Sequence, residues 1–274
     1  MIFDGRRPIG DKMKKSILII VVLFSCLFTL FAGGFSETKK FDLAKVINIE
    51  VDLMFENLTV STWDGNQIVV VSESNKEGVF PNITSINKTL QIRATDSGTD
   101  ILLGEQDSFC NISLMLPENY LSEKITIKAP SKKLDVKKLN AKTVHIIPGP
   151  ENSLANITAD YFEIRDLGEA DVNVFNLDCN SFNIAITAGD INLSLARVPA
   201  KDSKASVKCG KMNVTIPADS SFTIKADSYH SKFINNFTGT VDTWARDGIT
   251  YKHNGGGTVI DIRTFEGDIT VGVK

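Results

Sequence analysis

The feature that most constrains this chain is a ladder of short apolar triplets, which return about every ten residues between Ile125 and Ile224. In each triplet two apolar residues flank a mostly polar one. Because residues i and i+2 of a strand share a face, the apolar pair points to a core and the middle residue to solvent. The triplets are Ile125-Thr126-Ile127, Leu134-Asp135-Val136, Val144-His145-Ile146, Phe162-Glu163-Ile164, Val172-Asn173-Val174, Phe182-Asn183-Ile184, Ile191-Asn192-Leu193, Met212-Asn213-Val214 and Phe222-Thr223-Ile224.

This spacing predicts an all-β fold, a β-solenoid or β-helix-like stack of short strands. After the N-terminal segment, no window of about eleven residues keeps helical apolar spacing. Two series of triplets alternate, so about 20 residues make one coil of two strands. A β-sandwich, with turns every 8–12 residues, is the alternative. One series holds Phe162, Phe182 and Phe222, and the other holds Val172, Ile191 and Met212.

Glycines and gaps in the ladder predict the corners and the ends of the stack. Four glycines shortly precede strands, where corners with positive φ favour glycine: Gly168, Gly189, Gly210 and Gly267. The coil missing near residue 202 is expected to be filled by Ala205-Ser206-Val207. The last strand, Ile269–Val271, is expected to cap the stack.

Two strands also precede the ladder. Leu58–Val60 and Ile68–Val71 are separated by a turn cluster that contains Gly65. This arrangement predicts a hairpin or a solenoid corner.

Residues 1–36 are predicted to be a signal peptide or an N-terminal membrane anchor, outside the fold. Basic residues precede an uncharged apolar run from Ile17 to Ala32, and small residues follow, with cleavage expected after Gly34 or Ser36. The run is short for a bilayer span, which needs about 20 residues. A lipoprotein modified at Cys26 is a third interpretation, and Met13 is a second candidate start. The β-strand-repeat domain is expected over residues 41–274.

Charge and cysteine content exclude several classes of function. Without residues 1–36 the chain keeps 25 basic and 31 acidic residues, a net charge of about −6 that suits neither nucleic acid nor anionic lipid. Cys110, Cys179 and Cys209 are too few for a disulfide scaffold, and neither cysteines nor histidines have metal-ligand spacing. We therefore expect no metal and no cofactor. Cys179 and Cys209 precede triplets of opposite series, which predicts no disulfide between them.

Several stretches of the C-terminal half follow one pattern: Gly189-Asp190-Ile191-Asn192-Leu193, Met212–Pro217 with Phe222–Ala226, and Gly255–Val273. Together with Trp63–Val70 they resemble a bacterial family of β-strand-repeat domains of unknown function, often labelled "putative adhesin". The resemblance covers about residues 45–274. It implies an exported or membrane-anchored protein, in some members associated with envelope stress, and it implies no catalytic residues.

Two sets of polar residues recur with the strands. Asp171, Asp190 and Asp268 begin strands, where aspartate beside glycine is ordinary turn chemistry, although stacked carboxylates can also bind Ca²⁺ or act on a polysaccharide. Lys211 replaces the aspartate in another copy. The outward asparagines Asn173, Asn192 and Asn213 belong to one series. They are predicted to form an amide ladder, which could also serve as an interaction surface for a glycan or a partner strand.

These features predict an exported, non-enzymatic β-repeat module that acts as an adhesin or cell-envelope interaction protein. Its expected location is the periplasm, the cell surface or a membrane anchor. Its expected partner is a protein or a glycan of the envelope, and not nucleic acid. One alternative is a membrane-tethered accessory of an envelope-stress pathway, and another is a polysaccharide-active β-helix enzyme.

Overall fold

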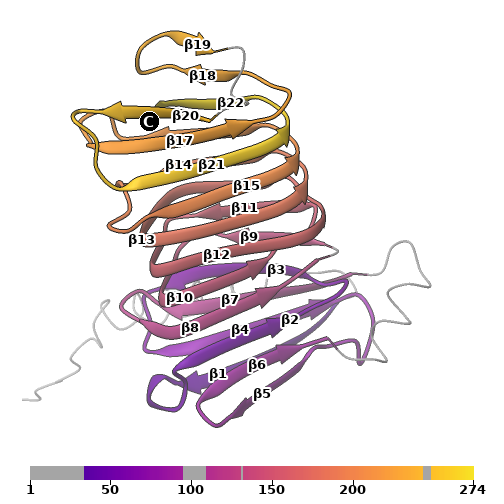
Figure 1. The fold of residues 1–274 in the computed structure, drawn as a ribbon. Coiled ribbons are helices and arrows are strands. Elements are labelled where there is room, and N and C mark those ends of the chain that lie inside the picture. Colours follow the sequence, from indigo (N-terminus) through magenta and orange to yellow (C-terminus); the bar gives the residue numbers. More distant parts are fainter. Residues whose placement is uncertain (1–33, 95–108, 131, 243–247) are drawn as a thin grey trace, which may run out of the picture. The chain divides into compact units, whose positions relative to one another are not determined.

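The computed structural model describes residues 34–94, 109–130, 132–242 and 248–274. Residues Phe35–Lys274 form one compact unit, and its described part consists of strands and a short 3-10 turn at Leu43–Lys45 (Figure 1). The predicted all-β class is therefore confirmed. The predicted signal or anchor segment lies, except for its last three residues, outside the described residues.

The strands pair in two sheets, A and B, which are joined by one long strand and enclose one apolar core. Sheet A contains β1 (Phe35–Asp42), β3 (Asn57–Trp63), β4 (Gln67–Ser74), β7 (Cys110–Pro117), β9 (Lys133–Val136), β11 (Glu151–Ala155), β14 (Ile191–Leu195), β16 (Met212–Ile216), β18 (Phe233–Asn235), β19 (Thr240–Asp242) and β22 (Ile269–Val273). Sheet B contains β2 (Asn48–Asp52), β5 (Asn82–Ile86), β6 (Thr89–Arg93), β8 (Ser122–Lys128), β10 (Leu139–Ile147), β12 (Ile157–Glu169), β15 (Ser203–Cys209), β17 (Phe222–Ser228), β20 (Ile249–His253) and β21 (Val259–Glu266). The long strand β13 (Val172–Ala188) passes from sheet A to sheet B.

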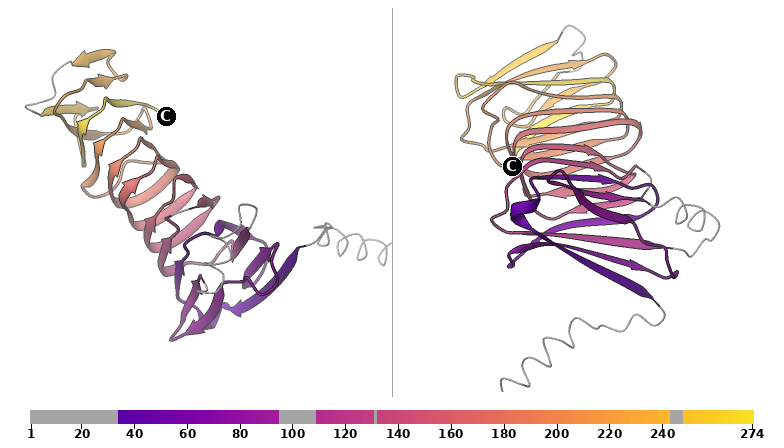
Figure 2. Two further views of the ribbon diagram at one scale, coloured as in Figure 1. Left: turned by 90° about the vertical axis from the view of Figure 1, so that its right-hand side faces the viewer. Right: turned by 90° about the horizontal axis from the view of Figure 1, so that it is seen from below.

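Parallel pairing of successive coils produces the predicted solenoid, seen side-on in Figure 2. In sheet B, Val144 pairs with Phe162 and Phe162 with Phe182, so one coil takes 18 or 20 residues. In sheet A, Val172 pairs with Ile191, which is 19 residues later. Since strands of a sandwich of this kind are antiparallel, the parallel register rules out the sandwich alternative.

The core is built from rows of inward side chains that run from coil to coil. Phe162 and Phe182 are neighbours in one row of sheet B and are fully buried. The next strand, β15, supplies the coil missing near residue 202, as predicted. The Oγ atom of its first residue, Ser203, accepts a hydrogen bond from the Phe182 N–H at 3.1 Å. Phe222 does not continue this row, because Ile224 occupies the matching position of β17. The expectation that Phe222 follows Phe162 and Phe182 in one row is therefore wrong.

The last two strands lie inside the stack, so the expectation that Ile269–Val271 caps it is wrong. β21 pairs with β15 on one side and β17 on the other, and β22 lies likewise between β16 and β18. Beyond β17 and β18, the antiparallel strands β20 and β19 follow. Triplet spacing indicates consecutive coils only, whereas the hydrogen bond from Val259 N–H to Asp202 Oδ1 joins residues 57 apart.

The N-terminal strands also pair out of sequence order. β2 and β3 lie directly on β8 and β9, with β6 and β7 on their other side. Leu58–Val60 and Ile68–Val71 are predicted to form a hairpin or a solenoid corner. β7 lies between β3 and β4 in sheet A, so the hairpin is wrong, and the turn joins two strands of the same sheet. β1 begins at Phe35, ahead of the expected domain boundary at residue 41, and pairs antiparallel with β4. Antiparallel strands thus interrupt the parallel stack at both ends.

Stacked glycines form one corner of the coils. Gly189, Gly210 and Gly267 have φ of +112°, +154° and +130°, as predicted, and a Cβ on Gly210 would overlap the carbonyl oxygen of Gly189. Gly168 does not belong to this corner. It lies where the register of β12 shifts, and Ala170 takes the place next to Gly189.

Candidate functional site

The predicted asparagine ladder is present on the outer face of sheet A. Asn173, Asn192 and Asn213 occupy matching positions of β13, β14 and β16. The Nδ2 atom of Asn192 donates to Oδ1 of Asn173 at 3.0 Å, and Nδ2 of Asn213 donates to Oδ1 of Asn192 at 2.9 Å. Asn152, a buried residue of β11, is linked to this ladder because its Oδ1 accepts the backbone N–H of Asn173 at 3.1 Å. The ladder therefore joins successive coils by side-chain hydrogen bonds, and a role in binding a partner stays a prediction.

The strand-initial aspartates are part of the corner. Oδ1 of Asp171 accepts the N–H of Asp190 at 2.7 Å, and Oδ1 of Asp190 accepts the N–H of Lys211 at 2.8 Å. Oδ1 of Asp268 accepts the N–H of Lys232 at 3.0 Å. Each carboxylate thus receives a backbone N–H of the adjacent coil, as an aspartate in turn chemistry does. No group of three or more His, Cys, Asp or Glu side chains that could hold a metal ion occurs in the described part of the chain.

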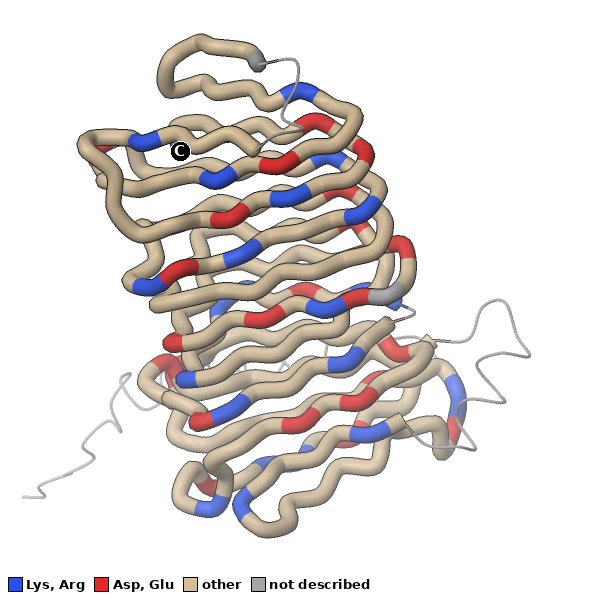
Figure 3. Tube along the Cα trace, in the orientation of Figure 1, with Lys and Arg blue, Asp and Glu red and all other residues tan. Residues whose placement is uncertain are grey.

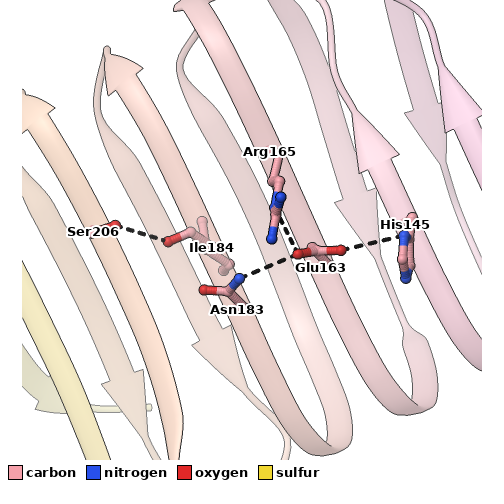
Figure 4. A network of polar contacts seen from close by, with 6 residues as sticks. All are labelled: His145, Glu163, Arg165, Asn183, Ile184 and Ser206. Atoms are coloured by element: carbon pink, nitrogen blue, oxygen red, sulfur yellow. Dashed lines mark hydrogen bonds and ion pairs between the residues drawn. The ribbon is translucent and has the colours of Figure 1, made fainter.

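A second polar network, centred on Glu163, lies on the outer face of sheet B (Figure 4). Glu163 is 8% exposed although it points outward, because its neighbours cover it. Its carboxylate accepts hydrogen bonds from Arg165 Nε at 2.8 Å and Asn183 Nδ2 at 3.2 Å, and it lies 3.3 Å from Nδ1 of His145. Glu163, His145 and Asn183 are all middle residues of triplets one coil apart. The sequence therefore contained the signal for this network, although sequence analysis did not single it out.

His145 is neutral in this network at neutral pH. Burial lowers the pKa of its imidazole below the usual 6.5, although Glu163 acts in the opposite direction. A neutral imidazole must carry its proton on Nδ1 to donate to the carboxylate. The side-chain partners of Glu163 described here are an imidazole, a guanidinium and an amide. A glycosidase of the usual kind needs a second carboxylate beside the first, so the network does not form that arrangement.

The outer face of sheet B is also hollowed at two places above β13 and β15. The outward residues Ser181, Ala185 and Ser206 are small, so larger neighbours rise around them. The first hollow has a volume of about 450 Å³, and its outward lining comprises Tyr161, Ser181, Asn183, Asp202, Lys204, Lys225, Val259 and Asp261. The second has a volume of about 400 Å³, and its outward lining includes Ser206, Lys208, Asp227, Tyr229, Arg263 and Phe265.

The charges of the described chain alternate in sign over the coils and do not form one large patch (Figure 3). Around the two hollows most acidic groups are engaged. Arg263 binds Asp261 through two hydrogen bonds of 2.8 Å, and Asp202 accepts the N–H of Val259 at 3.0 Å. The exposed lysines around the hollows make no ion pair with a described carboxylate: Lys204, Lys208 and Lys225. With Arg263, these lysines make four basic residues against the three acidic residues Asp202, Asp227 and Asp261, so the lining has a formal charge of +1 although the chain as a whole is acidic.

The three cysteines of the described residues are free, and two are buried. Burial raises the pKa of the Cys110 and Cys179 thiols to about 12, which makes them poor nucleophiles. Cys209 is exposed and lies opposite Ala188, nine residues along β13 from Cys179. At about 3.3 Å per residue this separates the two thiols by roughly 30 Å. Such a distance is incompatible with a Cys179–Cys209 disulfide.

Within the described residues, no helix has the length and apolar character needed to cross a membrane. No curated protein matches the chain significantly.

Several solved structures resemble the chain weakly. A structure described as a "putative cell adhesion protein" from Clostridium sporogenes is 14% identical, with 88% of this chain and 100% of that chain covered and a TM-score of 0.40. A "putative adhesin" from Bacteroides fragilis is 11% identical, with 88% and 97% covered and a TM-score of 0.46. Another from Parabacteroides distasonis is 13% identical, with 88% and 98% covered and a TM-score of 0.44.

The family comparison is more direct. Residues 153–272, which run from within β11 to within β22, match the family model described as Toastrack DUF4097. The predicted resemblance to a family of β-strand-repeat domains of unknown function is thus confirmed, and residues 153–272 are similar to the Toastrack DUF4097 family.

Proposed function

We propose that this chain is an exported, non-enzymatic β-solenoid that acts as an adhesin-like interaction module at the bacterial cell envelope. The proposal for export rests on the sequence pattern of residues 1–36, a basic start followed by an apolar run and small residues. The proposal for a binding role rests on how the polar side chains of the solenoid are used.

The observation that carries the proposal is the contrast between engaged and available polar groups. The aspartates that would serve an enzyme, Asp171, Asp190 and Asp268, each accept a backbone N–H of the adjacent coil. The outer face of sheet B, in contrast, offers two hollows bordered by exposed lysines and aromatic rings. Groups of this kind suit recognition of a partner, since polar anchors around a concave site fix its orientation.

The location is tested with the full chain produced in a bacterium. Cells are separated into cytoplasm, membrane and wall fractions, and intact cells are treated with protease. We expect the chain in an envelope fraction, and we expect purified protein to bind isolated envelopes saturably. Recovery of the chain in the cytoplasm, or no binding to envelopes, would refute the proposal.

The N-terminus distinguishes a released module from a membrane-tethered accessory. Mass spectrometry of the mature protein gives its first residue. Cleavage after Gly34 leaves all of β1 in place, whereas cleavage after Ser36 removes its first two residues. We therefore expect Phe35 as the first residue. Retention of Ile17–Ala32 would instead support the tethered form.

The enzymatic alternative has its own test. Turnover of bacterial polysaccharides by the purified chain is measured beside the Asp190→Asn variant, which keeps a side-chain acceptor for the Lys211 N–H. We expect no turnover by either protein. Turnover that is lost in Asp190→Asn would show that the chain is an enzyme.

A further inference from the structure

We propose that the outer face of sheet B binds an anionic glycan, which lies along the strands across both hollows. The two hollows together are called the sheet-B groove. This inference rests on the proposed function, because it names the ligand class of the same interaction module. The apolar pattern of the sequence does not indicate this groove, because part of its lining comes from β21, which pairs with β15 and β17 only in the fold.

The two hollows are aligned along the strand direction. The first is bordered by Asn183 and Lys204, which pair across β13 and β15. The second is bordered by Lys208, four residues further along β15. At about 3.3 Å per residue, roughly 13 Å separates these positions. The Arg263–Asp261 pair lies between the hollows, since Asp261 lines the first and Arg263 the second. This length suits an extended polymer better than a single small molecule.

The lining of the groove suits sugar rings. Ser181, Asn183 and Ser206 offer hydroxyl and amide groups that can donate and accept hydrogen bonds with sugar hydroxyls. Tyr229 and Phe265 are stacked at 5.1 Å between ring centroids, with an interplanar angle of 5°. They are 39% and 46% exposed, so they present apolar surface to the solvent beside the second hollow. A sugar ring has both an apolar face and a polar rim, and the groove offers partners for both.

The charge of the groove selects an anionic ligand. Its lining has four basic residues, Lys204, Lys208, Lys225 and Arg263, and three acidic ones, Asp202, Asp227 and Asp261, which gives a formal charge of +1. Asp261, in register between Lys204 and Lys225, is bound by Arg263, and Asp202 accepts a backbone N–H. Lys204 and Lys225 border the first hollow and Lys208 the second, each without an ion pair to a described carboxylate. Carboxylates or phosphates on the glycan would supply these missing partners, and hydrogen bonds to charged groups are the stronger ones.

Binding is measured by titration calorimetry with the full chain and four probes. Polygalacturonate carries carboxylates, a glycerol phosphate polymer carries phosphates, dextran is a neutral glycan, and polyglutamate is an acidic peptide. We expect binding to one or both anionic polyols, weakening with salt, and at least about tenfold weaker binding to dextran and polyglutamate. Binding to polygalacturonate alone or to the phosphate polymer alone identifies the anionic group of the ligand.

Variants test whether the groove is the site. Lys204→Gln with Lys225→Gln should weaken binding about tenfold or more, since two charged contacts are lost. Phe265→Ser should weaken it less, through the loss of ring contact. The matched control is Lys133→Gln with Lys211→Gln, which removes two exposed lysines that line neither hollow, one in β9 and one in the corner before β16, and should leave affinity unchanged. Circular dichroism confirms that each variant is folded.

Three results would overturn the inference: no binding of either anionic polyol, equal binding of dextran or polyglutamate, or equal affinity of the Lys204/Lys225 variant and the control. The proposed function fails separately. If the wild-type chain is found in the envelope and the Lys204/Lys225 variant binds isolated envelopes as tightly as the wild type, the proposed function is supported. The sheet-B groove is then not the binding site.

Discussion

At the scale of the residue, the glycine corner is the least tolerant part of the backbone. Gly210 combines a positive φ with close stacking on the carbonyl of Gly189. We expect Gly210→Ala to lower the free energy of unfolding by about 3 kcal/mol, because the added Cβ meets backbone atoms that cannot move aside. The measurement is urea unfolding followed by circular dichroism.

Gly168→Ala is the matched control for this prediction. An added Cβ there would meet only the Asp166 carboxyl group at 3.4 Å, and its φ is not positive. We expect a change below about 1 kcal/mol, since alanine also restricts the unfolded chain. Similar losses in Gly168→Ala and Gly210→Ala would show that the stacked corner is not the cause.

His145 makes stability depend on pH in a defined direction. Its pKa is lower in the folded protein than the usual 6.5, so the unfolded chain takes up this proton at higher pH. The stability associated with the neutral imidazole is therefore complete above pH 6.5 and is lost as pH falls through the lowered pKa. We expect His145→Gln to lose less stability than the wild type between about pH 7.5 and pH 5.5, as measured by urea midpoints. Equal losses would contradict a neutral His145 in the folded state.

At the scale of the element, the asparagine ladder joins three strands of sheet A through side chains. Asn192 is its central member, and it both donates to Asn173 and accepts from Asn213. Asn192→Ala leaves one acceptor and one donor without their partner, which should cost about 1–3 kcal/mol. The loss should appear in the urea midpoint.

Asn213→Ala provides the comparison, because Asn213 makes one ladder bond where Asn192 makes two. We expect it to cost about half as much as Asn192→Ala. Alanine at Asn173, Asn192 and Asn213 together separates scaffold from binding. If the triple variant binds isolated envelopes normally after correction for its lower stability, the ladder is a scaffold. If binding is lost while the fold remains, the ladder is the interaction surface.

The elements that could be predicted from the sequence are those with a local repeat. Asn173, Asn192 and Asn213 are spaced by one coil, so their stacking followed from the spacing alone. The pairing of β21 with β15 does not follow from this repeat, because the paired strands lie far apart in the sequence. Val259 and Asp202, which are hydrogen-bonded, are 57 residues apart. The prediction that Phe222 continues the series of Phe162 and Phe182 failed for a related reason. The spacing of Phe222 fits the aromatic series, but an inserted pair of strands separates its coil from that of Phe182.

The site follows the same logic. The network around Glu163 could be predicted from the sequence pattern, because its partners His145 and Asn183 lie on adjacent coils. The sheet-B groove could not, since Asp261 and Arg263 enter it from β21, which pairs between the strands of Lys204 and Lys225. Side chains assembled by nonlocal strand pairing must be located in the fold.

At the scale of the whole molecule, the order of coils in space predicts the order of local unfolding. Amides of strands inside the stack are bonded on both sides, whereas amides at the ends open with little loss of burial. Ile269 N–H donates to Lys232 O, and Met212 N–H donates to Asp268 O, so the last strand is held between two others. We expect hydrogen exchange of β22 in the intact chain to be as slow as that of β16. The antiparallel strands β19 and β20 should exchange faster, although they precede β22 in the sequence. A solenoid that ended on its last strand would show the reverse order, with β22 exchanging before β19 and β20.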